Sequence, residues 1–389
     1  MRITSINIQG FRAIESQRLD FEDRLRRPRP VTVIAGPNGC GKTSILFAVT
    51  NALRGVMGYR TEDVPPPSQD DIRLPSGRGG WHNAPSETRV EVELAISKDE
   101  QQAIRKVLQI VGWDVPPALP DDRLKVTWRY PPGFDKDGKP HSVFSADVSP
   151  AIFHIRSWLA GRRLAINAWQ NRMPGMTVDL LLQVGGLWLF PQDRNLLYRV
   201  VSGNGTAGQT LDDNPMIDMK QDAEFEDARS GSRPERSVSN ILKFLSEYVW
   251  ARDEKLPPER NWEKRVQELF NKVCAPKEYV GYKYRGDSPL GAPVIRDGDA
   301  QYPLSQAASG ELVVLEYATR LTYPSPLDRS IILIDEPEIH LHPTWVRKLY
   351  MALPEWGHEN QFILTTHSLE LKQRAQADGC LVDLGSLDS

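Results

Sequence analysis

The stretch GPNGCGKT, residues 36–43, decides the fold of this chain. It fits the pattern G-x-x-x-x-G-K-[ST], in which glycines permit a turn whose N–H groups surround phosphates, the lysine neutralises phosphate oxygens and the hydroxyl binds Mg²⁺. The β-branched run VTVIA, residues 31–35, precedes it, and apolar residues at helical spacing follow at Leu46, Val49 and Leu53. This strand, loop and helix order predicts nucleotide binding.

A second element, IILIDE at residues 331–336, reads as a buried strand that ends in two carboxylates. Asp335 is suited to hold Mg²⁺, and Glu336 to orient or deprotonate an attacking water, as phosphoryl transfer requires. Alone, such an ending often marks only the start of a capped helix. Together with the phosphate loop it favours the functional interpretation.

Two further elements follow the same logic. LSQAASGE, residues 304–311, precedes a helical stripe and puts Ser309 where a hydroxyl and free N–H groups would face an anion; the alternative is a simple N-cap. QFILTTHS, residues 361–368, places His367 just past a strand, within reach of a γ-phosphate. A single histidine there is usually structural, so the order of all four elements is what favours the functional interpretation.

Composition narrows the class of protein. With 389 residues the chain exceeds the roughly 250–300 at which single cores stop growing, and its 30 prolines exclude a continuous coiled coil. The three cysteines include no pair at metal-ligand spacing. No apolar run of about 18 residues and no signal-peptide core occur, so we expect a cytoplasmic protein without a membrane segment. The net charge of −3 restricts any nucleic-acid contact to local patches.

Alternating β and α patterns at both ends predict one α/β head interrupted by insertions. We expect its first part at 1–54, an inserted α+β lobe at 55–184, and a return to the head at 185–201. Residues 202–276 read as a polar loop followed by a short helical hairpin, with helices at about 237–252 and 260–274. The remainder, 277–389, holds the last three elements and begins with a β-hairpin around Asp297-Gly298-Asp299.

These motifs resemble the ATP-binding-cassette heads of the SMC, RecF and OLD ATPases, over roughly 1–54 and 277–389. The resemblance implies ATP and Mg²⁺ as ligands. It assigns nucleotide contacts to the loop residues, to Arg12 in the opening INIQGFRAI and to the signature: Asn38, Gly39, Cys40, Gly41, Lys42, Thr43, Ser44, Arg12, Ser309, Gly310 and Glu311. It assigns Mg²⁺ to Thr43, Asp335 and, by a looser match in LFPQDR, Gln192. Catalysis falls to Glu336, His367 and Lys42.

Departures from that family pattern are informative. Only 117 residues separate Gln192 from Ser309, which excludes the long coiled-coil tether of SMC-like proteins. The 22 residues after His367 leave no room for the nuclease that follows the head in OLD proteins, so a nuclease would be a separate chain. The signature Ser-Gly-Glu, in place of the Ser-Gly-Gly-Gln of transporter ATPases, argues against a transport subunit.

Because the chain holds one copy of each motif, the resemblance implies a head-to-head homodimer, or a higher multiple, in which the signature of one chain completes the site of the other. The principal hypothesis is therefore the sensor or regulatory ATPase of a prokaryotic anti-phage system, similar to the ATPase subunits of PARIS and Septu, with a separate effector such as an HNH or Toprim nuclease. The alternatives are a RecF-like DNA repair ATPase and a scaffold that binds ATP but barely hydrolyses it.

Two clusters leave alternatives open. Arg24, Arg26, Arg27 and Arg29 form a candidate phosphate-contacting patch for DNA, although such a run is more often a solvated loop. Glu338, His340 and His342 suggest a metal site, but the family head often shows a similar run leading into the helix at the dimer seam. We favour the solvated loop and the seam interpretation.

Overall fold

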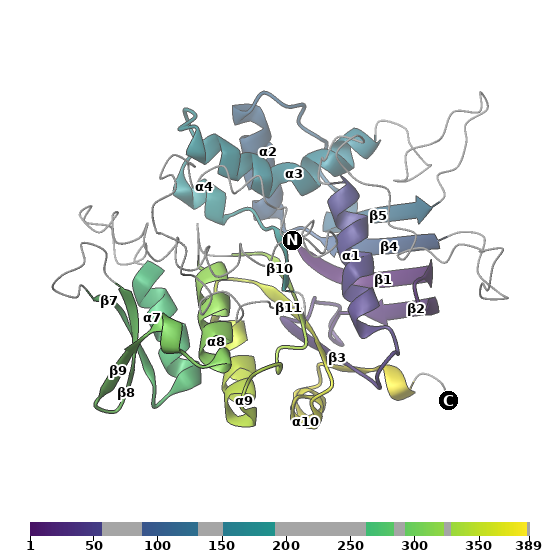
Figure 1. Cartoon of the computed structure of the whole chain (residues 1–389). Coiled ribbons are helices and arrows are strands. Elements are labelled where there is room, and N and C mark those ends of the chain that lie inside the picture. Colours follow the sequence, from purple (N-terminus) through teal and green to yellow (C-terminus); the bar gives the residue numbers. More distant parts are fainter. Residues whose placement is uncertain (57–87, 131–150, 191–261, 284–291, 323–327, 387–389) are drawn as a thin grey trace, which may run out of the picture. The chain divides into compact units, whose positions relative to one another are not determined.

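A computed structural model of the chain describes residues 1–56, 88–130, 151–190, 262–283, 292–322 and 328–386 (Figure 1). Its contacts divide the chain into two compact units. Unit 1 comprises Met1–Phe190, Asp328–Glu336 and Gly357–Ser389, and unit 2 comprises Pro191–Leu327 and Pro337–Trp356. The sequence-based segment boundaries stay a prediction.

The centre of unit 1 is a parallel five-stranded sheet in the order β12-β3-β11-β10-β6. Its strands are β3 (Val31–Ala35), β6 (Leu187–Phe190), β10 (Ile331–Asp335), β11 (Gln361–Thr366) and β12 (Leu381–Asp383). Every residue of β3, β10 and β11 is buried, as continuous apolar runs in parallel sheets predict. The carboxyl ends of these three strands meet at one edge of the sheet, where the phosphate loop, the Asp335–Glu336 pair and His367 lie.

A second, antiparallel sheet in unit 1 has the order β2-β1-β4-β5. It contains β1 (Arg2–Phe11), β2 (Ile14–Asp20), β4 (Thr88–Ala95) and β5 (Arg123–Tyr130). Buried and half-buried residues alternate along β4, which gives the sheet one core face. Helix α1 (Lys42–Val56) packs against β1, β4 and β5 (Figure 1). The helix that follows the phosphate loop is therefore anchored to both sheets' core.

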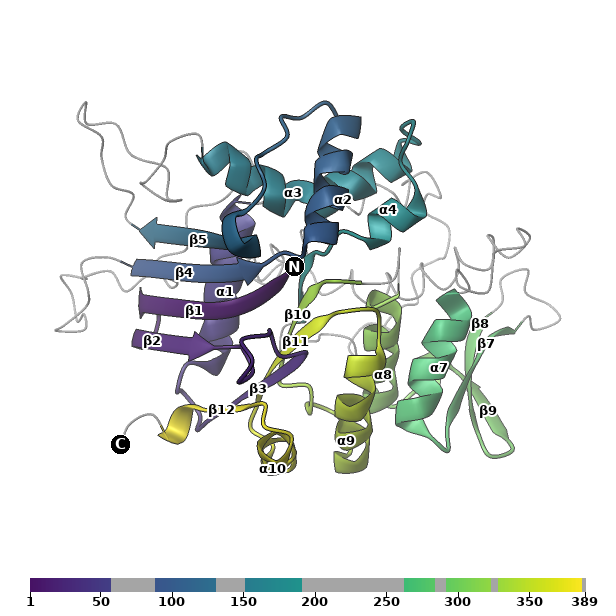
Figure 2. The same ribbon diagram turned by 180° about the vertical axis from the view of Figure 1, so that it is seen from behind.

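The inserted segment adds helices at one end of unit 1 (Figure 2). They are α2 (Lys98–Ile110), α3 (Ala151–Gln170) and α4 (Val178–Leu182), with a short 3₁₀ helix at Pro120–Asp122. Arg162 on α3 is buried, and its Nη1 donates to the carbonyls of Leu181 and Val184 at 2.5 and 3.0 Å. Burial lowers the pKa of Arg162 to about 10, partly offset by Asp328 and Glu100. This guanidinium fixes the chain leading into β6.

Unit 2 holds a three-stranded antiparallel sheet, β7-β8-β9, formed by β7 (Glu278–Lys283), β8 (Ala292–Asp297) and β9 (Ala300–Pro303). The predicted β-hairpin is confirmed, because Asp297 pairs with Ala300 and Gly298 adopts a φ of 59° in the turn. Helices α7 (Trp262–Cys274), α8 (Ser309–Arg320) and α9 (Pro343–Ala352) complete the unit, and α7 packs on the other two and on β7. The first helix expected in the hairpin, about 237–252, lies outside the described residues.

Helix α10 (Leu369–Ala377) in unit 1 and α4 were not predicted from the sequence. Three short 3₁₀ helices lie at Leu304–Gln306, Leu353–Glu355 and Leu384–Ser386. In the part of the chain that the structure describes, no helix combines the length and apolarity that crossing a bilayer requires.

Candidate nucleotide-binding site

The phosphate loop lies between β3 and α1, as the sequence predicts. Gly39 and Gly41 adopt φ values of 79° and 94°, a left-handed region that favours glycine. A Cβ at position 41 would also lie 2.9 Å from Ile14 Cγ1, at the start of β2. Gly41 is therefore required both for the turn and for close packing of the β1–β2 connection on the loop.

Lys42 is almost buried, with 4% of its surface exposed. Its ammonium donates to the carbonyl oxygens of Gly36 and Pro37, both at 3.0 Å, and lies 3.3 Å from His367 Nδ1. Cys40 Sγ is a more distant neighbour at 3.9 Å. The ammonium is thus folded onto its own loop, in position to exchange these carbonyls for phosphate oxygens.

Asp335 ends β10 with 2% of its surface exposed, and its Oδ1 accepts hydrogen bonds from two hydroxyls. Thr43 Oγ1 donates at 3.1 Å, and Thr365 Oγ1 also donates to the same oxygen. The parallel register sets this contact, because Asp335 lies opposite Thr365. A carboxylate beside a hydroxyl matches the oxygen ligands that Mg²⁺ prefers, so Thr43 and Asp335 fit the predicted ion.

Glu336 and His367 come together at the ends of β10 and β11. Glu336 has a φ of 49°, and its N–H donates to the Thr365 carbonyl at 3.1 Å. Its Oε1 lies 3.2 Å from His367 Nε2. Because an ammonium can only donate, the contact with Lys42 makes His367 Nδ1 the acceptor and leaves Nε2–H to donate to Glu336. Lys42, His367 and Glu336 therefore form one hydrogen-bonded chain.

A cavity of about 330 Å³ opens beside these hydrogen-bonded residues and is lined in part by His367. Its walls come from the start of the phosphate loop, the end of β11, the first turn of α10 and the end of β12, and include Pro37, His367, Lys372 and Asp383. Lys372 Nζ pairs with Asp383 at 2.6 Å, and this bond lowers the pKa of Asp383. Lys42 and Asp335 themselves do not line the cavity, which adjoins the predicted phosphate position.

The signature element lies in unit 2, at the N-terminus of α8. The extended residue before the helix is Ala308, and Ser309 is the first helical residue, so the simple N-cap interpretation of Ser309 does not hold. A Cβ at position 310 would lie 2.7 Å from the His340 carbonyl oxygen. Gly310 therefore permits the turn before α9 to approach α8 closely. Glu311 is wholly buried and accepts from the Ala308 N–H at 2.9 Å.

The other residues predicted to bind nucleotide or Mg²⁺ differ in their distance from the phosphate loop and in their exposure. The Arg12 guanidinium lies 4.4 Å from the centroid of the Phe47 ring on α1, which brings it to the helix of the phosphate loop. Asn38 is exposed at the tip of that loop, and Ser44 is half-buried in the first turn of α1. Gln192 lies outside the described residues. Whether any of these contacts nucleotide stays a prediction.

The alternative metal site finds no support in the described ranges. No group of three or more His, Cys, Asp or Glu side chains suited to a metal occurs there. His342 instead caps α9, where its Nδ1 accepts from the Thr344 N–H at 3.3 Å. His340 is exposed with a φ of 65° in the turn that leads to this helix.

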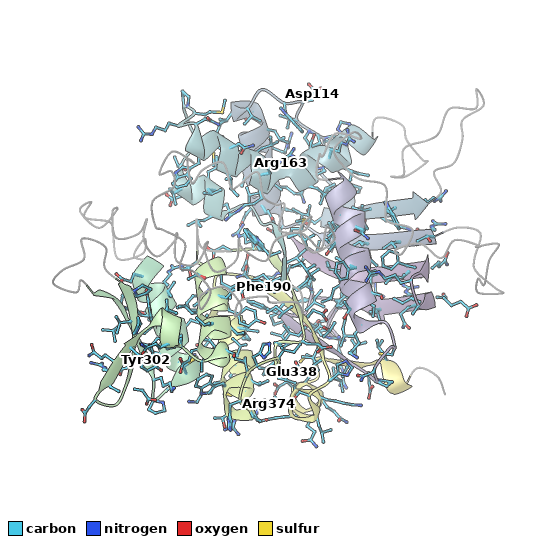
Figure 3. The ribbon with its side chains drawn as sticks, viewed as in Figure 1. Asp114, Arg163, Phe190, Tyr302, Glu338 and Arg374 are labelled. Atoms are coloured by element: carbon cyan, nitrogen blue, oxygen red, sulfur yellow. The ribbon has the colours of Figure 1, made fainter. Side chains whose placement is uncertain are left out.

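Sequence reasoning missed two groups of residues, one in each unit, that hold predicted residues in place. Thr365 holds Asp335 through its hydroxyl and Glu336 through its carbonyl, and a hydroxyl at the end of the strand next to the Asp-Glu strand was the available signal. Lys277 and Tyr302 bind Glu311 in unit 2, and Figure 3 labels Tyr302 on β9. These two residues carry no recognisable motif.

Two family models match the chain. One, described as "AAA domain, putative AbiEii toxin, Type IV TA system", matches residues 219–371, and one described as "AAA domain" matches residues 5–129. A stretch of 85 residues is 34% identical to the "Retron Ec83 probable ATPase" of Escherichia coli. That match covers 19% of this chain and only 16% of the relative, so it compares a small part of each protein.

Solved structures give weaker similarity over the whole length. An SMC head bound to the C-winged helix domain of ScpA is 14% identical, with a TM-score of 0.47, over 95% of this chain and 91% of that one. The SMC head domain from Thermotoga maritima is 15% identical, with a TM-score of 0.40, over 98% and 94%.

Both ends of the chain are thus similar to AAA-type P-loop ATPases. The predicted fold class, an α/β P-loop ATPase head, is confirmed by the parallel sheet with the loop between β3 and α1. At this edge of the sheet a lysine, a threonine and an aspartate lie near a second carboxylate and a histidine, which are residue types that phosphate and Mg²⁺ binding use.

Proposed function

We propose that the chain is an ATP-binding and ATP-hydrolysing enzyme that works as a head-to-head homodimer. The observation that carries this proposal is the hydrogen-bonded chain of Lys42, His367 and Glu336 beside the Thr43–Asp335 pair. Mg²⁺, when bound at Thr43 and Asp335, would neutralise phosphate charge. Lys42 exchanges its loop carbonyls for phosphate oxygens, which leaves His367 and Glu336 to orient the water that attacks.

In the proposed reaction, Glu336 accepts the proton of the attacking water and His367 donates its Nε2–H toward the transferred phosphoryl group. Ser309 and the first amides of α8 of the second copy face the same phosphate. The γ-phosphate therefore contributes contacts to both copies, and its release removes the preference for the closed dimer.

The decisive test is Glu336→Gln, with phosphate release and dimer mass measured in parallel. Removal of a general base costs about 10²–10⁴-fold in turnover, while ATP binding and closure remain. We expect lost hydrolysis and a dimer that persists in ATP. Lys42→Ala serves as the contrasting variant, because it should abolish both binding and dimerisation. Unchanged turnover in Glu336→Gln would instead favour the scaffold that binds ATP and barely hydrolyses it.

For the biological role, we propose a regulatory subunit of a prokaryotic anti-phage system, in the cytoplasm, with a separate effector that is an HNH or Toprim nuclease. The similarity to a retron ATPase and to the AbiEii-type model supports this role. Its test is phage plating on cells that carry the intact operon, against the same operon with Lys42→Ala. Equal plating on the two strains, without co-purification of a neighbouring gene product, contradicts the role and leaves the ATPase assignment standing.

A RecF-like repair ATPase is the second candidate, and the β2–β3 loop is the observation that favours it. Arg24, Leu25 and Arg26 are exposed at its tip, and Asp23 braces the turn by accepting from the Leu25 and Arg27 N–H groups at 2.8 and 3.0 Å. An ordered basic tip suits a phosphate backbone. DNA-stimulated hydrolysis that is lost in Arg24→Glu/Arg26→Glu would favour repair, and hydrolysis indifferent to DNA would favour defence.

A further inference from the structure

The N-terminus of α8 is fixed by a network of charged and polar residues around the buried carboxylate of Glu311. Glu311, the third residue of α8 and part of its first turn, has none of its surface exposed. Its Oε2 accepts from the Ala308 N–H at 2.9 Å, and its Oε1 accepts from the Tyr302 hydroxyl at 3.0 Å and from Lys277 Nζ. Both carboxylate oxygens are therefore used inside unit 2, on the side away from solvent.

Lys277 connects this carboxylate to the three-stranded sheet. It lies just before β7, and its ammonium also pairs with Asp297 at the end of β8, at 3.3 Å. The hydrogen bond with Glu311 is the largest cause that raises the pKa of Lys277, so the group stays charged at neutral pH. Tyr302, on β9, adds a third strand to the network. Residues on or next to each of the three strands thus take part in the network around Glu311.

The position of Ala308 explains what the network controls. Its N–H bond to Glu311 sets where the extended chain turns into the helix, and the next two residues are Ser309 and Gly310. The first N–H groups of a helix have no intrahelical acceptor and point along its axis. Their direction, and that of the Ser309 hydroxyl, follows from how Glu311 holds the turn.

We propose that Lys277 and Tyr302 are positioning residues, which act through Glu311 to aim Ser309 and Gly310 at the phosphate bound by a second copy of this chain. This inference rests on the proposed dimeric ATPase. It reassigns Glu311 from a nucleotide contact to the anchor of the signature turn. Removal of the ammonium leaves a buried, unpaired carboxylate, which is costly and moves toward water. The Ser309 hydroxyl and the first N–H groups of α8 then no longer point in a fixed direction, while the phosphate loop in unit 1 keeps its contacts.

The test compares Lys277→Met with native protein in two assays that use Mg²⁺ and a non-hydrolysable ATP analogue. The first measures analogue affinity at protein concentrations where the chain is monomeric, and the second measures the dimer dissociation constant by sedimentation. We expect an affinity within about twofold of native and a dimer weakened about tenfold or more. Arg296→Met is the matched control, because it breaks an exposed ion pair with Glu278 in the same sheet and should change neither value.

A complementation assay separates positioning from general damage. In an equal mixture of Lys277→Met and Lys42→Ala, each mixed dimer has one site with an intact phosphate loop from the first chain and an intact signature from the second. Turnover of the mixture should therefore exceed the sum of the turnovers that the two variants show when each is measured alone, because only the mixed dimer has such a site. Lys277→Arg, which keeps the charge, should recover part of the dimer affinity.

The results of these assays separate a failure of the positioning role from a failure of the proposed dimer. Dimerisation of Lys277→Met equal to native, or no recovery of turnover in the mixture, overturns the positioning role and leaves the ATPase assignment intact. Failure of native protein to dimerise with the analogue overturns the proposed dimer and this inference with it. If Lys277→Met does not fold, Tyr302→Phe replaces it: we expect a dimer weakened about threefold, from one lost hydrogen bond, and an unchanged dimer overturns the proposal.

Discussion

The phosphate-loop site of unit 1 and the signature end of α8 in unit 2 differ in how their polar groups are satisfied. In unit 1, Lys42, His367 and Glu336 bind one another, and Asp335 accepts from two threonines. Among the contacts of Lys42, those with the Gly36 and Pro37 carbonyls are ones that phosphate oxygens can replace, because both are acceptors. The reacting groups are thus held near their working positions by temporary partners, a form of preorganisation that avoids leaving charges bare.

The signature end shows the opposite arrangement. The charged residue Glu311 is fully engaged, while Ser309 at the helix start is half-exposed. Within the described residues, no side-chain hydrogen bond of Ser309 is present. The first N–H groups of such a helix have no acceptor within the helix, so a bound anion can supply one. The phosphate-loop site is thus arranged to exchange partners, whereas the start of α8 is arranged to receive one.

The largest expected effect is that of Gly310→Ala. The added Cβ would meet the His340 carbonyl oxygen at 2.7 Å and Trp345 Cζ3 at 3.3 Å, so the turn before α9 must move. Overpacking of this kind costs about 1–3 kcal/mol, which outweighs the roughly 1 kcal/mol gained in helix propensity. We expect turnover to fall about 100-fold with analogue affinity within about twofold, because only the receiving end is displaced.

Gly298→Ala is the control for that variant, since a Cβ there meets nothing within 4 Å and only the φ of 59° is strained. It should lower the stability of unit 2 without changing turnover. If Gly310→Ala instead weakens ATP binding by the monomer, the start of α8 and the phosphate loop are not independent, which contradicts this difference between the two regions.

The second prediction concerns Thr365→Val in the exchanging region. The substitution removes the hydroxyl that donates to Asp335 and accepts from the Glu336 N–H at 3.3 Å. Loss of such an outer partner typically costs about 10–100-fold in metal affinity or activity. We expect the Mg²⁺ concentration for half-maximal hydrolysis to rise about tenfold.

Titration of hydrolysis with Mg²⁺ checks this expectation. Thr50→Val is the matched control, because its hydroxyl donates only to the Leu46 carbonyl within α1 and its loss should leave the Mg²⁺ dependence alone. A Thr365→Val enzyme with native Mg²⁺ dependence would show that Asp335 needs no partner from β11.

The sequence predicted the local part of this site and not the part that long-range contacts create. GPNGCGKT and IILIDE were recognisable because a strand, a turn and the chemistry lie within one short segment. Helix α10 was missed because LELKQRAQA is polar and buries only Leu371 and Ala375, which gives too weak a periodicity. The partners of Glu311 lie 34 and 9 residues away along the chain, so only the fold brings them together.

The smallest expected effect concerns charge in the scaffold of unit 1, where partners are permanent. Glu91 on β4 is 15% exposed. Burial alone would raise its pKa, but hydrogen bonds from Lys125, Arg89 and Asn7 outweigh burial and lower the pKa from 4.5 to about 2. A depressed carboxyl pKa stabilises the fold fully above the unfolded value, and that contribution is lost as the pH falls from about 4.5 to 2.

Glu91→Gln should therefore destabilise the protein by about 2 kcal/mol at pH 7, after allowance for solvent screening, and by about half as much at pH 3. Urea unfolding of native and variant protein at the two pH values measures this difference. Because Glu91 exchanges no partner during the proposed reaction, ATP turnover at pH 7 should stay native. A stability difference that does not change with pH would mean that shape, and not the ionised carboxylate, holds β4 to its neighbours.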